Sequence, residues 1–141
     1  MTFAGRTAVI TGGAGVIGTA TARRLVAGGA RVALVDRDAQ RLESVARDLG
    51  AANVVTIVAD VTKEADCEAY ARQAAAALGP IDVFFNNAGV EGVTAPTRAY
   101  PLDVFEKVMA VNVTGVFLGL KHMIPVMRDG GSIIKIGRAH V

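Results

Sequence analysis

The 141-residue sequence contains a single cysteine, Cys67, so no disulfide can form within the chain. A lone cysteine is typical of a reducing compartment, and we expect a cytoplasmic location. The sequence also lacks an N-terminal targeting pattern and an apolar run as long as a membrane span. These absences exclude a disulfide framework and predict that the protein has no membrane partner.

A strong charge of one sign is also missing. The 15 basic and 13 acidic residues are interleaved along the chain and leave a formal net charge of +2. Such a distribution provides no basic patch that could follow a phosphate backbone, so we expect no nucleic-acid partner. His122 has no histidine, cysteine or carboxylate near it at ligand spacing, and we expect no metal site.

Hydrophobic residues make up 52% of the sequence, enough for one domain with a buried core. Short β-branched or apolar runs alternate with segments of helical spacing, at residues 7–10, 31–35, 54–58, 81–85 and 132–134. The runs are almost continuously apolar, as required of parallel strands that are buried on both faces. We therefore predict an α/β fold, a doubly wound parallel sheet with helices on both faces.

Two of the intervening segments show the spacing of amphipathic helices. Thr62 is placed to cap the second of them, and Gly50 and Gly79 are placed to end the two helices. The apolar faces contain Leu42, Val45, Ala46 and Leu49 in the first helix, and Cys67, Tyr70, Ala71, Ala74 and Leu78 in the second.

A glycine-rich turn at residues 11–18 follows the first strand and precedes a helix, which is the context of a dinucleotide-binding turn. Gly12 would permit the tight turn, and a middle glycine would let a pyrophosphate come close to the backbone. Gly18 would let the helix pack on the strand. The helix N-terminus would then face the anion. The alternative is a glycine-rich connection without a ligand. The predicted binding residues here are Thr11, Gly12, Gly15, Val16, Ile17 and Gly18.

Asp36 ends the second strand, 18 residues after Gly18, close to the spacing of about 20 at which an acid accepts hydrogen bonds from the adenosine ribose. This favours NAD. The carboxylate would repel the 2′-phosphate of NADP, a repulsion that the neighbouring Arg37 would only partly offset. In the alternative interpretation, Asp36 is a turn residue or a helix cap.

With these motifs the chain resembles the short-chain dehydrogenase/reductase family over residues 1 to about 135. Asp60 and Val61 follow the third strand, where the family places an acid against the adenine. Asn86-Asn87-Ala88-Gly89 follows the fourth strand, and in the family this segment lines the cofactor crevice and braces the sheet. The resemblance implies a Rossmann fold and hydride transfer between a nicotinamide and an alcohol or carbonyl substrate.

Asn112 matches the active-site asparagine of the family, which supports a proton-relay water and the catalytic lysine. The residue also interrupts an apolar face, where an amide must find hydrogen-bond partners. The alternative is a structural asparagine bonded to nearby backbone. The other residues of that helical face are Phe105, Val108, Met109 and Val116.

The glycine spacing departs from the family pattern, because Val16 occupies the place of the middle glycine. The spacing of Gly12, Gly15 and Gly18 is instead that of the longer subgroup, which includes sugar-nucleotide epimerases. The later motifs favour the dehydrogenase subgroup, with Gly15 providing the close approach. An epimerase-like enzyme is the second alternative.

The catalytic serine and the Tyr-x-x-x-Lys pair of the family have no match. Lys135 to Arg138 stand where Asn-x-Ser-Ser is expected, and neither Tyr70 nor Tyr100 is followed by a lysine four residues later. We therefore expect a C-terminally truncated binding domain, residues 1–135, that is inactive by itself. A non-catalytic dinucleotide-binding or sensing module is the alternative. The last six residues, 136–141, resemble the translation of a sequencing-adapter oligonucleotide, and we expect no role for Arg138 or His140.

The last predicted helix is apolar around its circumference, which indicates either core burial or a subunit interface. By resemblance, we expect the full-length parent to be a homo-oligomer, and we expect the isolated fragment to aggregate through uncovered apolar surface. The apolar residues are Phe117, Leu118, Leu120, Met123, Ile124 and Met127.

Overall fold

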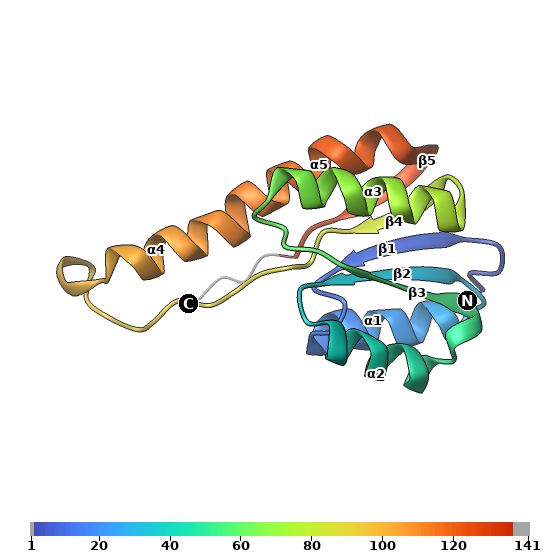
Figure 1. The fold of residues 1–141 in the computed structure, drawn as a ribbon, viewed down its shortest axis with the longest axis horizontal. Coiled ribbons are helices and arrows are strands. Elements are labelled where there is room, and N and C mark those ends of the chain that lie inside the picture. The colour runs from blue at the N-terminus through green and yellow to red at the C-terminus, as the bar shows by residue number, and fades with distance from the viewer. Residues whose placement is uncertain (1, 137–141) are drawn as a thin grey trace.

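The computed structural model describes residues 2–136 and contains a five-stranded parallel sheet with the strand order β3-β2-β1-β4-β5. The predicted doubly wound α/β fold is confirmed (Figure 1). The strands are β1 (Thr7–Thr11), β2 (Arg31–Asp36), β3 (Val54–Val58), β4 (Ile81–Phe85) and β5 (Met127–Ile134). The α-helices are α1 (Val16–Ala27), α2 (Ala39–Leu49), α3 (Glu64–Leu78), α4 (Leu102–Met109) and α5 (Gly115–Met123).

Helices cover both faces of the sheet, as the apolar strands require (Figure 1). On one face, Ile10 and Leu34 pack in a cluster with Leu25 of α1 and Leu42 of α2. On the other face, strand residues pack against α3 and α5. The residues of this second cluster include Val9, Val35, Ile57, Tyr70, Leu78, Phe84, Leu118 and Met123.

The predicted helix ends are correct, but one predicted cap is wrong. Gly50 and Gly79 follow α2 and α3 with φ of +86° and +81°, values that favour glycine. Thr62 does not cap α3, which begins at Glu64 with Lys63 before it. Its hydroxyl donates instead to Oδ1 of Asp60 at 2.7 Å, because a carboxylate two residues upstream is the stronger acceptor.

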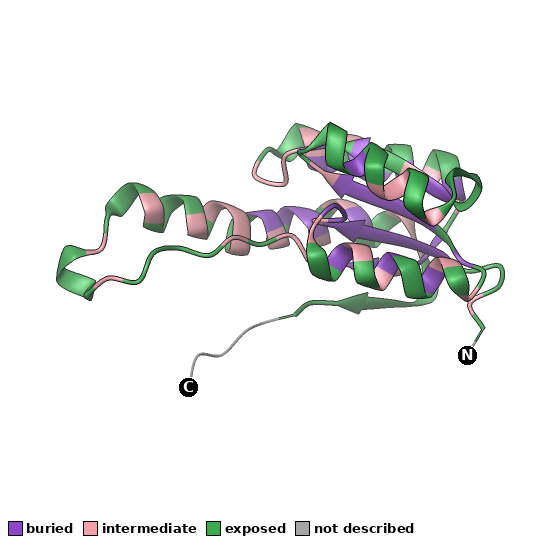
Figure 2. Ribbon diagram, turned by 90° about the horizontal axis from the view of Figure 1, so that it is seen from below, coloured by how far each residue is buried: buried purple, intermediate pink, exposed green. Residues whose placement is uncertain are grey.

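A single long helix follows the fourth strand, made of α4, a π-helical turn (Ala110–Thr114), α5 and a 3₁₀ turn (Ile124–Val126). It is long and apolar enough to span a membrane, which corrects the sequence-based statement that no such run exists. Its two halves differ in burial (Figure 2). Gly115, Leu118, Gly119 and Met123 are buried, whereas α4 has no buried residue and projects beyond the sheet (Figure 1).

The last strand, β5, begins at Met127, five residues before the predicted start. It pairs with β4 across an irregularity between Ile81 and Val83, where Gly130 takes a φ of +77°. Most of β5 is exposed (Figure 2). The residues predicted to form a non-native tail lie, from position 137 onward, outside the described residues.

Candidate functional site

The glycine turn and the 86–89 segment meet at the carboxyl ends of β1 and β4, where the strand order reverses direction. Thr11 Oγ1 accepts hydrogen bonds from the N–H groups of Asn87 and Ala88, each at 3.0 Å. The Asn87 side chain donates to the Thr11 carbonyl at 3.0 Å. A Cβ on Gly12, which has a φ of +65°, would lie 3.0 Å from the Ala88 Cα. The structure therefore joins two predicted motifs that lie about 75 residues apart in sequence.

The glycines of the turn serve different purposes. A Cβ on Gly18 would collide with the Gly12 carbonyl oxygen, so Gly18 allows the start of α1 to pack against the backbone that directly follows β1. Gly13, which sequence reasoning missed, lies against β2, and its Cβ would be 2.9 Å from Leu34 Cβ. Gly15 is less crowded, with the Gly12 oxygen 3.2 Å from a Cβ. Val16, the first residue of α1, is 84% exposed, so its side chain does not obstruct the turn.

Asp36 ends β2, as predicted, beside the glycine turn. Its two carboxylate oxygens accept from the backbone N–H groups of Ala14 at 3.2 Å and Asp38 at 3.3 Å. Asp38 is the residue that caps α2, by accepting from Arg41 N–H at 3.0 Å. The helix-cap interpretation of Asp36 is therefore wrong, whereas its predicted role toward a ribose stays a prediction.

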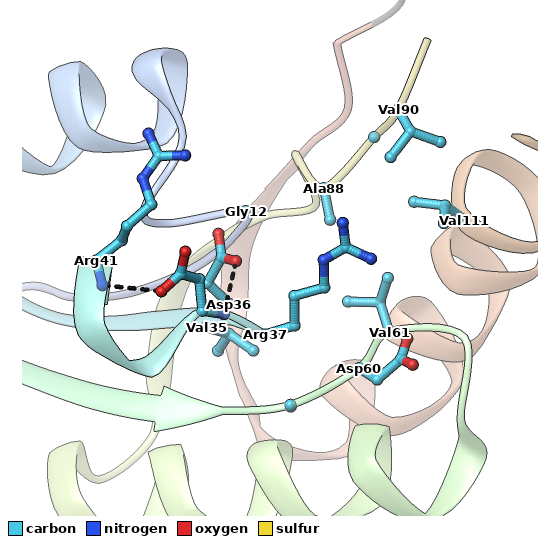
Figure 3. Close-up of a pocket in the computed structure, with 13 residues that line it drawn as sticks. Gly12, Val35, Asp36, Arg37, Arg41, Asp60, Val61, Ala88, Val90 and Val111 are labelled. Atoms are coloured by element: carbon cyan, nitrogen blue, oxygen red, sulfur yellow. Dashed lines mark hydrogen bonds between the residues drawn. The ribbon is translucent and has the colours of Figure 1, made fainter. Parts of the chain in front are cut away.

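A cavity of about 260 Å³ opens in front of Asp36 (Figure 3). The Arg37 side chain extends across it, from the end of β2 toward Val61 (Figure 3). Thirteen residues line the cavity: Gly12, Val35, Asp36, Arg37, Asp38, Arg41, Ala59, Asp60, Val61, Ala88, Gly89, Val90 and Val111.

Asp60 contributes to the wall of this cavity while its carboxylate holds a turn. Oδ1 accepts from the Thr62 hydroxyl at 2.7 Å and from the Thr62 N–H at 3.0 Å. These hydrogen bonds, together with the positive charges of Lys63 and Arg37, lower the pKa of Asp60 below its ordinary value. The site therefore presents two carboxylates, at Asp36 and Asp60, beside the Arg37 guanidinium.

Asn112 lies in the π-helical turn between α4 and α5. Its Oδ1 accepts from Val90 N–H and its Nδ2 donates to the Val90 carbonyl, both at 2.9 Å. The predicted need of this amide for partners is thus met by backbone, as in the structural alternative. The proposed apolar face is not continuous, because the π turn changes the helical register and Phe105 and Met109 are 50% and 39% exposed. Single-turn π-helices occur frequently at functional sites.

Asn86 joins the sheet to the long helix. Its buried side chain donates to the Val116 carbonyl of α5 at 2.9 Å. The helix comes this close because of glycine: a Cβ on Gly119 would lie 2.9 Å from Asn86 Nδ2, and one on Gly115 would lie 3.0 Å from Val61 Cγ2. Sequence reasoning missed both glycines, although their four-residue spacing places them on one helical face.

A second cavity of about 680 Å³ adjoins the first, since both are lined by Gly89 and Val90. Together the two form an elongated site that runs from Asp36 to Asn112, past the glycine turn. Among residues 2–136, no group of three or more histidine, cysteine or acidic side chains is arranged to hold a metal ion. The other lining residues of the second cavity are Ile17, Asn87, Glu91, Gly92, Val93, Thr94, Tyr100, Val108, Asn112, Lys135 and Ile136.

Comparison with known proteins matches residues 6–139 to the short chain dehydrogenase family. The chain is 43% identical to levodione reductase from Leifsonia aquatica, over 99% of this chain and 54% of that protein. It is 36% identical to 2-dehydro-3-deoxy-L-rhamnonate dehydrogenase (NAD(+)) from Sphingomonas sp. (strain SKA58), over 92% of this chain and 51% of that protein. The chain thus spans about half the length of these curated relatives.

Solved structures agree with the sequence comparison. A crystal structure of levodione reductase superposes with a TM-score of 0.88 at 42% identity, covering 93% of this chain and 53% of that one. NAD⁺-bound xylitol dehydrogenase superposes with a TM-score of 0.86 at 36% identity, covering 89% of this chain and 49% of that one. These likenesses confirm both the predicted resemblance and the Rossmann fold.

Proposed function

Since the chain belongs to the short-chain dehydrogenase/reductase family of oxidoreductases, we propose that its site binds NAD in preference to NADP. The observation that carries this proposal is the position of Asp36, at the carboxyl end of β2 and on the wall of the cavity beside the glycine turn. A carboxylate there accepts hydrogen bonds from ribose hydroxyls and repels a 2′-phosphate. Relatives whose names or titles include NAD or NADH support the proposal.

The site fits a dinucleotide in shape and in chemistry. The first N–H groups of α1 have no partner within the helix and face the turn, where they suit a pyrophosphate. Arg37 and Val61 border the cavity at which we place the adenine. When bound, the nicotinamide supplies a carbon that gives or accepts hydride, and we place it at the larger cavity, near Asn87 and Asn112.

Asn112 is our candidate for the catalytic machinery. Its side chain is engaged with Val90, so we propose that it fixes this segment at the boundary of the two cavities. Through the family resemblance, its place in the π turn suits support of a proton-relay water. We propose an alcohol or carbonyl substrate, the type of compound to which the names levodione reductase and xylitol dehydrogenase refer.

We further propose that the chain by itself transfers no hydride. Its two tyrosines, Tyr70 and Tyr100, are not followed by a lysine four residues later, so the acid/base pair of the family is lacking. Hydride transfer by the purified 141-residue chain, with host enzymes excluded, would overturn this. Hydride transfer by the complete gene product would distinguish an enzyme from a module that only binds or senses NAD. A cytoplasmic location and a homo-oligomeric parent stay predictions.

The cofactor proposal is tested by titrating the protein with NAD and NADP and measuring the dissociation constants by calorimetry. We expect NAD to bind at least about tenfold more tightly, because a charged hydrogen bond contributes about 1.5–3 kcal/mol. Asp36→Ala should weaken NAD binding by about tenfold or more and remove most of the preference. Asp48→Ala, at an exposed carboxylate of α2 that lines neither cavity, is the control and should leave the NAD/NADP ratio unchanged. Tighter binding of NADP by the unaltered protein would refute the assignment.

A further inference from the structure

We propose that Tyr100 is a positioning residue for the substrate, which acts by fixing residues 90–94 as one wall of the larger cavity. The inference rests on the proposed oxidoreductase function. It concerns a residue outside the glycine turn, the 86–89 segment and the Asn112 position. Tyr100 precedes α4 and lies on a connection that packs against neither face of the sheet.

The Tyr100 hydroxyl lies against the backbone of this wall. The N–H group of Val93 donates to the Tyr100 oxygen at 3.3 Å. A Cβ on Gly92 would collide with the same oxygen, and would lie 3.2 Å from the Cζ carbon of the ring. Gly92 does not take a positive φ, so the tyrosine, and not backbone conformation, explains the glycine.

Two side chains therefore hold one short segment. Asn112 binds Val90 through both backbone groups, and Tyr100 binds Val93 three residues later. Without regular secondary structure, residues 90–94 depend on such bonds for a defined conformation. Side-chain bonds of this kind hold the segment in one conformation before a ligand binds, so less conformational entropy is lost on binding.

The two anchors act on different parts of the site. Val90 lines both cavities, whereas Val93 and Tyr100 line only the larger one. Loss of the Tyr100 hydroxyl should thus affect the compound bound in the larger cavity and leave the adenine and ribose end intact. This separation is what distinguishes a positioning role from a general contribution to stability.

The test replaces Tyr100 with phenylalanine in the complete gene product and measures steady-state reduction of levodione and a panel of cyclic ketones with NADH. For the best substrate we expect KM to rise about fivefold, the equivalent of one neutral hydrogen bond of about 1 kcal/mol. The kcat and the dissociation constant of NADH should change less than twofold. Tyr70→Phe is the matched control, because Tyr70 is buried in the core cluster and lines neither cavity.

Gly92→Ala tests the same contact from the opposite side. The added methyl group occupies the place of the Tyr100 oxygen, so this variant alone should raise KM at least as much as Tyr100→Phe. In the Tyr100→Phe background the same substitution should have a smaller effect, because the oxygen is gone. This non-additivity depends on the contact itself.

The possible results separate the two proposals. Three results would each overturn the positioning role while leaving the oxidoreductase proposal intact. They are an unchanged KM in Tyr100→Phe, additive effects of the two substitutions on KM, and a loss of NADH affinity in Tyr100→Phe as large as the rise in KM. Failure of the complete gene product, without substitutions, to bind NADH or to reduce any ketone of the panel would overturn both.

Discussion

The region from β1 to β4 and the region from α4 to β5 differ in how their apolar residues are covered. In the first region, β1, β2 and β4 are buried between helices on both faces. In the second, Leu102, Phe105 and Phe117 of the long helix are exposed, as are Ile133 and Ile134 of β5 (Figure 2). Contacts within the chain therefore cover the central strands of the first region, with Val16, Ile17 and Val58 exposed at its margins, but cover the second region only along the inner face of α5.

This difference separates the parts of the candidate site. Gly12, Asp36 and the 86–89 segment lie at the ends of strands of the covered region, and bonds from backbone N–H groups to the side chains of Thr11 and Asp36 connect them. Asn112 of the second region and Tyr100, which immediately precedes that region, both bind the segment 90–94. The part of the site that we propose for the cofactor therefore lies at the ends of buried strands, whereas the part that we propose for the substrate lies on a connection without regular secondary structure.

The largest expected contrast is between two phenylalanines. Phe84 in β4 is fully buried, whereas Phe117 in α5 is 61% exposed. We expect Phe84→Ala to lower the free energy of unfolding by about 3–5 kcal/mol, and Phe117→Ala to change it by no more than about 0.5 kcal/mol. Urea unfolding followed by circular dichroism measures both values. A similar loss from the two substitutions would show that the second region is covered in solution.

A smaller effect is expected at Asp82, which connects the two regions at the amino ends of the strands. This carboxylate, 5% exposed, accepts from Arg6 at 2.8 Å and from Thr7 N–H at 3.0 Å, and it pairs with Arg128 of β5 at 3.1 Å. We expect Asp82→Asn to lower the free energy of unfolding by about 2 kcal/mol, as for charged hydrogen bonds. Asp48→Asn, at an exposed carboxylate of α2, is the control.

The contribution of Asp82 to the free energy of unfolding should depend on pH. Burial alone would raise the pKa of Asp82, but the bonds from Arg6 and Thr7, with the charge of Arg128, hold it below the ordinary value of 3.8. A depressed folded-state pKa stabilises the protein above the unfolded pKa, and this contribution is lost as pH falls through the folded-state value. The difference between the unaltered protein and Asp82→Asn should therefore be full near neutral pH and shrink below pH 3.8. A difference that stays constant with pH would contradict this.

The smallest expected effect is at Gly119, where α5 meets the covered region. Glycine to alanine within a helix normally stabilises by up to about 1 kcal/mol. Here the new Cβ would lie 2.9 Å from Asn86 Nδ2 and 3.1 Å from the Tyr70 hydroxyl, and we expect a net loss of about 1 kcal/mol. The melting temperature of Gly119→Ala tests this expectation. A higher melting temperature than that of the unaltered protein would show that α5 is loosely packed against the covered region. Val113→Ala, at an exposed position in the preceding π turn, provides the control.

The sequence by itself determined the fold and the positions of the glycine turn and Asp36 at the ends of strands. Nearly continuous apolar runs become buried parallel strands where helices cover both faces, so the pattern of residues placed β1 to β4. It missed the first five residues of the exposed β5. The glycine turn and Asp36 could be predicted because each lies at the end of a strand whose residues mark that end. The same local reasoning placed Gly50 and Gly79 at the ends of helices.

Only the tertiary structure decided which distant groups satisfy one another. Asn112 was predicted from its motif, yet its partner is the backbone of Val90, 22 residues away. The roles of Gly119 and Tyr100 likewise depend on contacts across the fold. Hydrogen bonds and close packing act over a few ångströms in space, and spacing along the chain does not reveal which groups folding brings that close.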